Sequence, residues 1–453
     1  MEYTKELARF VAKKEFDDFS DEIINQTKLL ILDTLGCALG GYRLAKEEVE
    51  WIVNFVIGQG CKGPSTVFAN GYKTSSAYAA LANGAMVHTI DFDDTHMGSV
   101  AHLNASLLGT TIAMGEELQS SGKDIITSFI LGFEVGARAG RSVMPSHYKF
   151  WHPTATFGGI AAAAAAAKMM RLDSERTEYV IGHSIDAASG LRYCLENGDF
   201  SKTLHPALAA MKAILFANIV KLGADGPKGM FEYPSGFCKA YSEAADMEVL
   251  NKDLGKNYEI MEDSIKSFPT LQCSHTAIQS TLDIIKDKKL NKNDIKEVRI
   301  VHTETVKGQG CNYAPTTTLA ARLSIPFSIA LAICDGKVTV DQFTEERLKD
   351  PEIIDYMGKV FIEASSEFKT KYPETIAAFV DIKDKNGITH SGSQIYPKGD
   401  PRNRMSTDEV KNKFKALALN TFDREHVDKI AEVVVNLDKI SNISELTNLL
   451  VRD

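Results

Sequence analysis

The chain has 453 residues, of which 44% are hydrophobic and 25% charged, and its formal net charge at pH 7 is −9. This composition is ordinary for a globular protein and excludes the disordered, collagen-like and coiled-coil classes. The acidic balance argues against a general nucleic-acid binder, which would be basic. An acidic chain can still hold a local basic pocket for an anionic ligand. The length predicts two or three domains, or one large core with an insertion.

The N-terminal segment 1–16 has no apolar core of the kind found in signal peptides and has the pattern of a first helix. No uninterrupted run of ~18 apolar residues indicates a membrane span. The seven cysteines are scattered and form no C-x-x-C pair. We therefore expect neither a disulfide framework nor a structural zinc site, and reduced thiols predict a cytoplasmic protein.

The first 260 residues carry mainly helical patterns. Residues 23–39 predict a long apolar helix that Gly40 and Gly41 should end, because glycine is the preferred residue just past a helix. Residues 154–167 contain seven successive alanines, which predict a buried helix packed closely on its neighbours. Further helices are expected over 75–87, 103–118, 124–141, 202–222 and 272–286.

The pattern changes after about residue 295. Residues 297–302 alternate apolar and polar side chains, and 376–382 and 388–395 flank an Asn-Gly pair, which predicts a hairpin. Ser406 and Glu409 then form the capping box of a last group of helices. We predict a mainly α fold in which segments 1–264 and 401–453 form a large all-helical domain. A smaller α+β lid domain of residues 265–400 interrupts it.

The richest polar segment is HTIDFDDTHMGSVAH, residues 88–102, between two apolar helices. A network of helix caps and loops is one interpretation. A metal site is another, but no H-x-x-x-H or comparable ligand spacing appears. General acid–base chemistry is the third, because imidazole titrates near neutral pH. His102 is the favoured acid–base group and Asp91 follows it.

Cations and imidazoles also occur in apolar surroundings at three other places. His152 precedes the alanine-rich helix, Lys202 and His205 precede a helix of small residues, and Lys266 precedes the helix expected at 272–286. Each has a structural alternative, as a helix cap or a solvated lysine. Gathered around one cavity, they would suit a di- or tricarboxylate.

The sequence contains no G-x-G-x-x-G motif after a strand, no phosphate-binding P-loop and no G-x-S-x-G elbow. The sequence therefore lacks these three signatures of cofactor binding or nucleophilic catalysis. Cys273 and His275 lie two positions apart, a spacing that points their side chains in different directions on one helix. This argues against a Cys–His nucleophile made from that pair.

Six segments carry a shared pattern: LDTLGCALGG (32–41), ANGAMVHTIDFDDTH (82–96), HPTATFGGIAAAAAAAK (152–168), GDFSKTLHPALAA (198–210), KSFPTLQCSH (266–275) and YPKGDPRNRMS (396–406). Through them the sequence resembles the MmgE/PrpD family over almost its whole length. That family includes 2-methylcitrate dehydratase, cis-aconitate decarboxylase and iminodisuccinate epimerase. The resemblance implies a discontinuous helical domain with a lid, a site between the domains, and a homodimer. It also implies action on a small polycarboxylate without a required metal or organic cofactor. From the acidic charge and the lack of an apolar span we expect no nucleic-acid or membrane partner.

The resemblance also implies the site residues. Their expected roles are catalytic for His102, Asp91, Lys266 and Tyr313, and substrate-binding for Thr95, His152, Lys202 and again Lys266. Dehydration, decarboxylation and epimerisation share one chemical difficulty, which is the formation of a carbanion or enediolate beside a carboxylate. Lysines and a protonated histidine would stabilise that charge, and a histidine would move the proton.

We therefore expect a cofactor-independent lyase that dehydrates or decarboxylates a substrate like 2-methylcitrate or cis-aconitate. An epimerase or isomerase of an amino- or imino-dicarboxylate such as iminodisuccinate is the alternative. A non-catalytic carboxylate-binding protein and a metal-dependent hydratase are further alternatives. His102-Leu103-Asn104 and Phe268-Pro269 depart from the usual family pattern and leave the substrate subclass open.

Overall fold

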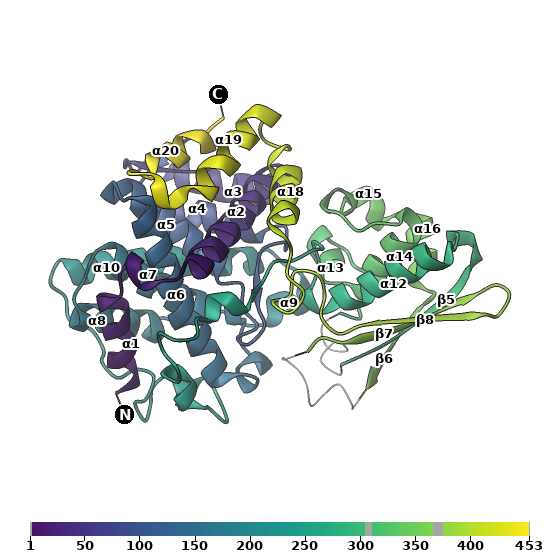
Figure 1. The fold of residues 1–453 in the computed structure, drawn as a ribbon, viewed down its shortest axis with the longest axis horizontal. Coiled ribbons are helices and arrows are strands. Elements are labelled where there is room, and N and C mark those ends of the chain that lie inside the picture. Colours follow the sequence, from purple (N-terminus) through teal and green to yellow (C-terminus); the bar gives the residue numbers. More distant parts are fainter. Residues whose placement is uncertain (1, 304–309, 366–374, 453) are drawn as a thin grey trace.

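The computed structural model describes residues 2–303, 310–365 and 375–452. Figure 1 shows a large helical region beside a smaller region that contains a sheet. The fold is therefore mainly α with a smaller α+β part, in agreement with the prediction.

The helical region is built from both ends of the chain. Its N-terminal helices are α1 (Tyr3–Lys13), α2 (Asp21–Leu44), α3 (Lys46–Gly58), α4 (Ser76–His88), α5 (Asn104–Leu118), α6 (Gly122–Val143), α7 (Pro153–Met169), α8 (Ser174–Asp186), α9 (Tyr193–Asn197), α10 (Ser201–Lys221) and α11 (Phe237–Ala240). Its C-terminal helices are α18 (Thr407–Ala418), α19 (Arg424–Val435) and α20 (Ser444–Thr447). Two short strand pairs join loops of this region: β1 (Ser65–Thr66) with β2 (Lys73–Thr74), and β3 (Thr95–His96) with β4 (Asp263–Ser264).

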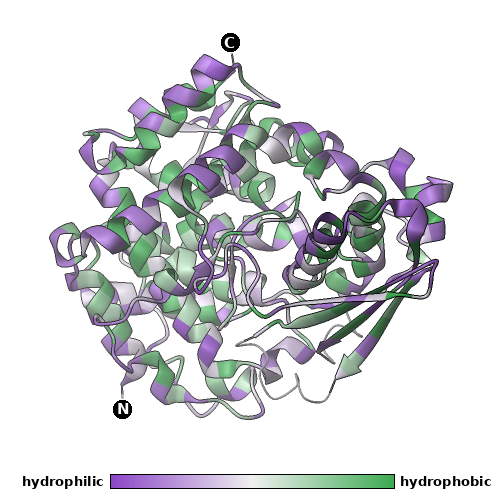
Figure 2. Cartoon of the chain, turned by 45° about the vertical axis from the view of Figure 1, so that its right-hand side comes forward, coloured by the Kyte–Doolittle hydropathy of each residue, from purple (hydrophilic) through white to green (hydrophobic). Residues whose placement is uncertain are grey.

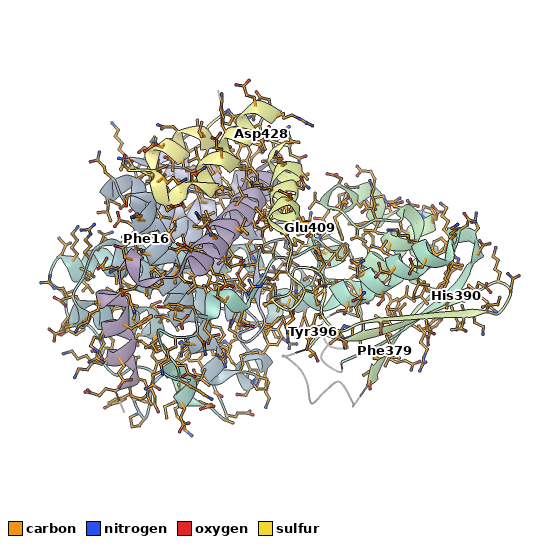
Figure 3. All side chains as sticks on the ribbon, in the orientation of Figure 1. Phe16, Phe379, His390, Tyr396, Glu409 and Asp428 are labelled. Atoms are coloured by element: carbon orange, nitrogen blue, oxygen red, sulfur yellow. The ribbon has the colours of Figure 1, made fainter. Side chains whose placement is uncertain are left out.

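The C-terminal helices pack back onto the N-terminal ones, and α18 lies against α2. One apolar core includes side chains from both segments, such as Leu35 and Phe414. The predicted capping box begins α18: the Ser406 N–H donates to the Glu409 carboxylate over 2.7 Å, and the Glu409 N–H donates to Ser406 Oγ over 3.2 Å. Glu409 is labelled in Figure 3.

Small residues allow the central helices to approach one another closely. The seven alanines of α7, 161–167, are all fully buried. A Cβ added at Gly132 of α6 would lie 2.6 Å from the Ala161 carbonyl oxygen, so no larger residue fits there. The predicted close packing of the alanine-rich helix is confirmed.

The expected end of the 23–39 helix at Gly40 and Gly41 is wrong. Helix α2 continues through both glycines to Leu44. A Cβ at Gly41 would lie 2.1 Å from the Met86 carbonyl oxygen of α4. Glycine is needed here because α2 and α4 touch, and not because the helix stops.

The smaller region contains α12 (His275–Lys288), α13 (Thr318–Arg322), α14 (Ile325–Asp335), α15 (Glu345–Leu348) and α16 (Pro351–Met357). Its sheet has the strand order β6 (Val360–Ser365), β5 (Ile295–Thr303), β7 (Ala378–Asp384) and β8 (Thr389–Gln394). Strand β5 runs parallel to β6 and antiparallel to β7, and β7 and β8 form the expected hairpin. Figure 2 shows apolar residues on these strands and on the helices beside them, where a second core lies between residues 268 and 382. The exact domain boundaries at 264 and 400 stay a prediction.

Among the described residues, α10 is the one helix long and apolar enough to cross a bilayer by length and composition. Half of its most apolar window, 50%, is buried inside the protein. It packs against α4, α5, α7 and α8, as a core helix does.

Candidate active site

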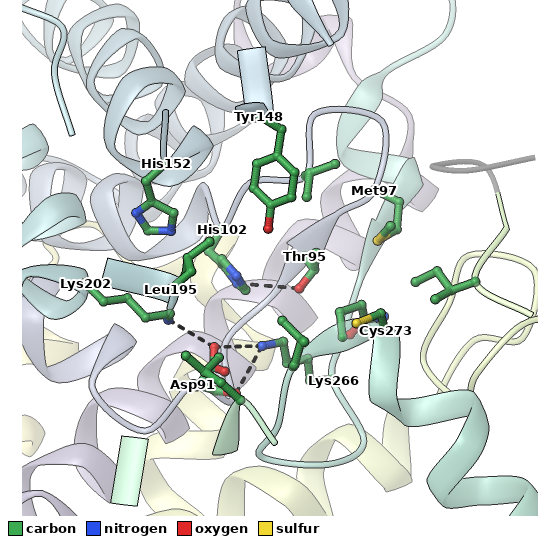
Figure 4. A pocket seen from close by; sticks show the side chains of 15 residues that line it. Asp91, Thr95, Met97, His102, Tyr148, His152, Leu195, Lys202, Lys266 and Cys273 are labelled. Carbon is green, nitrogen blue, oxygen red and sulfur yellow. Dashed lines mark hydrogen bonds and ion pairs between the residues drawn. The ribbon is translucent and has the colours of Figure 1, made fainter. Parts of the chain in front are cut away.

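A cavity lies where the two regions meet, and Figure 4 shows the side chains that line it. The helical region contributes most of the wall, and the smaller region contributes residues before α12, after α13 and before β7. The lining residues are Asp91, Thr95, Met97, Val100, His102, Tyr148, His152, Leu195, Lys202, Lys266, Leu271, Gln272, Cys273, Leu323 and Ile376. Six of the site residues expected from the sequence therefore lie around one cavity.

Asp91 joins the two lysines at the cavity floor. Its Oδ1 lies 3.1 Å from Lys202 Nζ and 2.9 Å from Lys266 Nζ, as the dashed lines in Figure 4 indicate. Lys202 is 111 positions and Lys266 175 positions from Asp91 in the sequence. All three side chains are at most 2% exposed. The fold has thus gathered two buried ammonium groups on one carboxylate.

The backbone at Asp91 is itself unusual. Asp91 has a φ of +52°, in the left-handed region that few non-glycine residues adopt. Its N–H donates to the carbonyl of His88, the last residue of α4. Burial alone would raise the pKa of Asp91, but Lys202 and Lys266 outweigh it and hold that pKa well below its usual range. Asp91 is therefore a permanent anion between two cations.

A short strand pair places Lys266 beside Asp91. Thr95 in β3 pairs with Ser264 in β4, and Lys266 follows two residues later. The Lys266 ammonium also donates to the Asp91 carbonyl oxygen over 3.1 Å. The loop after α4 and the chain entering the smaller region are thus tied together at the site.

His88 was not among the site residues selected from the sequence. Its Nε2 lies 2.8 Å from Lys202 Nζ, and its Nδ1 lies 2.7 Å from Asp93 Oδ2. An ammonium group only donates, so Nε2 accepts and the Nδ1 proton is donated to Asp93. Neutral His88 therefore orients the Lys202 ammonium. The sequence feature that could have identified His88 as a site residue is its position in the 88–102 segment, three residues before Asp91.

His102 is held as a proton acceptor. Its Nδ1 is in hydrogen-bond contact with the Asp94 carbonyl oxygen and lies 3.5 Å from Thr95 Oγ1. A carbonyl only accepts, so the proton resides on Nδ1 and the lone pair on Nε2. Nε2 has no hydrogen-bond partner among the described residues. Burial and the nearby Lys266 charge lower the pKa of His102 well below its usual value, although Asp93 opposes them. The ring is neutral and suited to act as a base.

His152 closes the cavity at the start of α7. Its Nδ1 lies 2.8 Å from His205 Nδ1. Burial and the neighbouring His205 lower the pKa of His152 well below its usual value. Burial lowers the pKa of His205 to about 4. His205 does not line the cavity, and its position behind His152 required the tertiary structure.

Tyr313 is not a lining residue. Its side chain is 45% exposed, and its hydroxyl donates to the Val360 carbonyl oxygen over 2.9 Å. The structure does not bring Tyr313 to the other site residues, and its catalytic role stays a prediction.

Cys273 does line the cavity, but burial raises the pKa of its thiol to about 12. A thiol in that state is a poor nucleophile. His275 lies with its ring nitrogens toward Ser267 and Thr270, not toward Cys273. The expectation that this pair is not a Cys–His nucleophile agrees with the geometry.

Within the described residues, two groups of three side chains have donor atoms within 4.8 Å of one another and could hold a metal ion: His88, Asp93 and His102, and His152, Cys194 and His205. In the first group His88 Nε2 already faces the Lys202 ammonium, which repels a cation. The residues on the cavity wall are instead arranged for anions. Two ammonium groups can hold carboxylates, and an adjacent neutral imidazole can move a proton.

The chain is similar to known proteins over nearly its whole length. The sequence profile of the MmgE/PrpD N-terminal domain matches residues 5–250, and that of the MmgE/PrpD C-terminal domain matches residues 268–439. The chain is 26% identical to a cis-aconitate decarboxylase of Aspergillus terreus, over 99% of this chain and 95% of the relative. It is 24% identical to the cis-aconitate decarboxylase of Homo sapiens, over 99% and 94%. It is also 24% identical to the mitochondrial 2-methylcitrate dehydratase of Yarrowia lipolytica, over 99% and 90%. The two profiles together cover most of the sequence, and the chain belongs to the MmgE/PrpD family.

Proposed function

We propose that this protein is a lyase that removes carbon dioxide or water from a small polycarboxylate through a carbanion-like or enediolate-like state. The observation that carries the proposal is the convergence of Lys202 and Lys266 on Asp91 beside His102. Similarity to cis-aconitate decarboxylases and 2-methylcitrate dehydratases supports the same reaction class. Within that class a cis-aconitate-like substrate is our first choice, because the decarboxylases are the more similar relatives.

Charge balance explains how the cavity would accept a polyanion. The two lysines and Asp91 leave one net positive charge at the floor. The imidazoles of His102 and His152 are held neutral by burial and by neighbouring positive charges. Carboxylates entering the cavity would oppose that effect and favour protonation of both rings. Substrate and proton binding would then support each other.

For dehydration, His102 Nε2 would remove a proton from a carbon next to a carboxylate. The electron pair would delocalise onto that carboxylate, whose negative charge the lysines stabilise. The substrate hydroxyl would then accept the proton from His102 and leave as water. For decarboxylation, carbon dioxide would leave and the electron pair of the broken C–C bond would delocalise onto the remaining carboxylate that the lysines stabilise. Protonated His102 would then deliver its proton to carbon. Both reactions use the same groups.

The test is incubation of the purified protein with cis-aconitate, 2-methylcitrate, citrate and iminodisuccinate, followed by mass spectrometry and chiral analysis of the products. We expect loss of carbon dioxide from cis-aconitate, and turnover lower by about 10²–10⁴-fold in a His102→Gln variant. Loss of water from 2-methylcitrate alone would select the dehydratase reaction within the class. An unchanged mass with altered chirality would overturn the lyase proposal in favour of an epimerase.

We also propose a cytoplasmic homodimer. All seven cysteines are free, which suits a reducing compartment. Large apolar side chains are exposed on α3, including Trp51 and Phe55, and on α10, including Leu215 and Ile219. Light scattering should give twice the mass of one chain, and Leu215→Glu should reduce it to one chain. A monomeric wild type would refute the dimer.

A further inference from the structure

Three metal-binding side chains meet at the cavity wall, and two of them, Cys194 and His205, have no role in the proposed reaction. His152 lies just before α7, Cys194 in α9 and His205 in the second turn of α10. His205 Nδ1 lies 2.8 Å from His152 Nδ1 and 3.8 Å from Cys194 Sγ. All three donor atoms are within 4.8 Å of one another. The cluster therefore joins three separate helices.

This donor set matches a borderline-soft divalent metal ion. Zinc binds imidazole at about 2.0–2.1 Å and thiolate at about 2.3 Å, and its tetrahedral geometry separates ligand nitrogens by about 3.4 Å. The two imidazole nitrogens lie 2.8 Å apart, so only a small outward shift would admit the ion. Two nitrogens and one sulfur leave a fourth position for water or a carboxylate, as in open zinc sites.

The surrounding charges permit a cation. Lys202 acts on all three side chains, and Asp199 acts on Cys194 and His205. The further contributors are His88 and Lys212 at His205, and His88 and His102 at His152. The Lys202 ammonium is already paired with Asp91, and the Asp199 carboxylate favours positive charge nearby. Metal binding would release the Cys194 thiol proton to solvent. The proton between the two Nδ1 atoms would move to an outer Nε2.

We propose that His152, Cys194 and His205 form an inhibitory site for a zinc-like divalent ion. His152 also lines the cavity, where it is expected to contact a substrate carboxylate. An ion that binds Nδ1 fixes the ring and places a second charged centre at the cavity wall. The metal would therefore act as an inhibitor of a reaction that itself needs no metal.

The test is titration of the purified full-length protein with Co²⁺, because cobalt–thiolate bonds give a characteristic near-ultraviolet charge-transfer absorption. We expect this band at one equivalent of Co²⁺, its displacement by Zn²⁺, and its loss in Cys194→Ser. The matched control is Cys273→Ser, which removes the other thiol on the cavity side and should keep the band. His205→Gln should weaken Co²⁺ binding at least ~10-fold. These readouts do not depend on the proposed lyase activity.

Inhibition gives the second measurement. Zn²⁺ should inhibit wild type, and Cys194→Ser should need ~100-fold more Zn²⁺ for the same inhibition while keeping its activity without metal. Circular dichroism confirms that each variant is folded. A cobalt–thiolate band that survives in folded Cys194→Ser, or no band in wild type, would overturn the metal site. A normal band with no zinc inhibition would overturn its inhibitory role.

Discussion

Two of the buried ionic centres among the described residues differ in their unused hydrogen-bonding capacity. The cavity centre consists of Asp91, Lys202, Lys266 and His102. The α6 centre consists of Glu134 and Arg138, whose Nε donates to Glu134 Oε1 over 2.6 Å. In the α6 centre the other polar atoms of both side chains form hydrogen bonds to protein groups, whereas in the cavity centre some do not.

Protein groups satisfy the α6 centre on every side. Arg138 Nη1 donates to the carbonyls of Val249 and Lys252 over 3.0 and 2.7 Å, and Glu134 Oε2 accepts from the Glu259 N–H over 2.7 Å. Burial raises the pKa of Glu134 to about 7 despite the arginine. This centre ties α6 to the 249–259 segment, and each of its side-chain nitrogen and oxygen atoms has at least one protein partner.

The cavity centre keeps unused capacity. Two ammonium groups share a single carboxylate, Asp91 Oδ2 has no hydrogen-bond partner among the described residues, and His102 Nε2 is also free. Burial of charge is common to both centres, so it does not by itself identify function. A candidate functional site is identified instead by charged groups and hydrogen-bonding atoms that lie next to a cavity and lack protein partners.

The largest effect is expected from His102→Gln, which removes the proton-transfer group of the cavity centre. We expect kcat to fall by about 10²–10⁴-fold, because general acid–base catalysis contributes that much. The measurement is steady-state turnover of the substrate identified in the screen. His147→Gln is the control, since His147 is a buried histidine outside the cavity. Equal activity of His102→Gln and wild type would refute the role of His102.

Arg138→Leu tests the opposite property at the α6 centre. We expect the free energy of unfolding to fall by about 3–5 kcal/mol, because Glu134 loses its buried partner. Turnover per folded molecule should not change. Urea denaturation measures the loss, and Arg171→Leu is the control, since Arg171 is paired with Asp124 but 81% exposed. That exposed pair should contribute under about 1 kcal/mol. A loss of activity without a loss of stability would contradict the comparison.

Lys266→Met removes one of the two cations that face the substrate. We expect kcat/KM to fall by about 10²–10³-fold, the usual cost of one electrostatic group in an active site. Kinetics with the same substrate measure it. Lys212→Met is the control, because Lys212 lies near His205 but bonds the Ala187 carbonyl outside the cavity. Unchanged kinetics in Lys266→Met would show that Lys266 only balances Asp91.

Asp93→Asn gives the smallest and most specific effect. The Asp93 carboxylate raises the pKa of His102, while burial and Lys266 lower it. Removing that negative charge should move the His102 pKa, and the limb of the pH–kcat/KM profile that reports it, to lower pH. For dehydration, activity is lost below this pKa because the base must be neutral. For decarboxylation it is lost above, because the acid must be protonated. A limb that moves to higher pH would refute the arrangement in either case.

Much of the architecture could be predicted from local pattern. The period of apolar residues indicated the helices and the sheet strands, and Ser406 and Glu409 predicted a cap that forms. The glycines at 40 and 41 misled that approach, because their role is a contact with Met86 of another helix. A sequence read locally cannot distinguish a glycine that ends a helix from one that admits a neighbour.

The sequence by itself determined the residue types of the site, and its motifs identified six of the residues that line the cavity. Only the tertiary structure decided the charge, tautomer and hydrogen-bond partners of these residues. Lys202 and Lys266 meet on Asp91 because a strand pair and two helices bring distant segments together. His88 and His205 gained partners that no spacing predicted, and Tyr313 lies elsewhere. Charge, tautomer and pKa depend on burial and on the nearest charges, and these are properties of the folded chain.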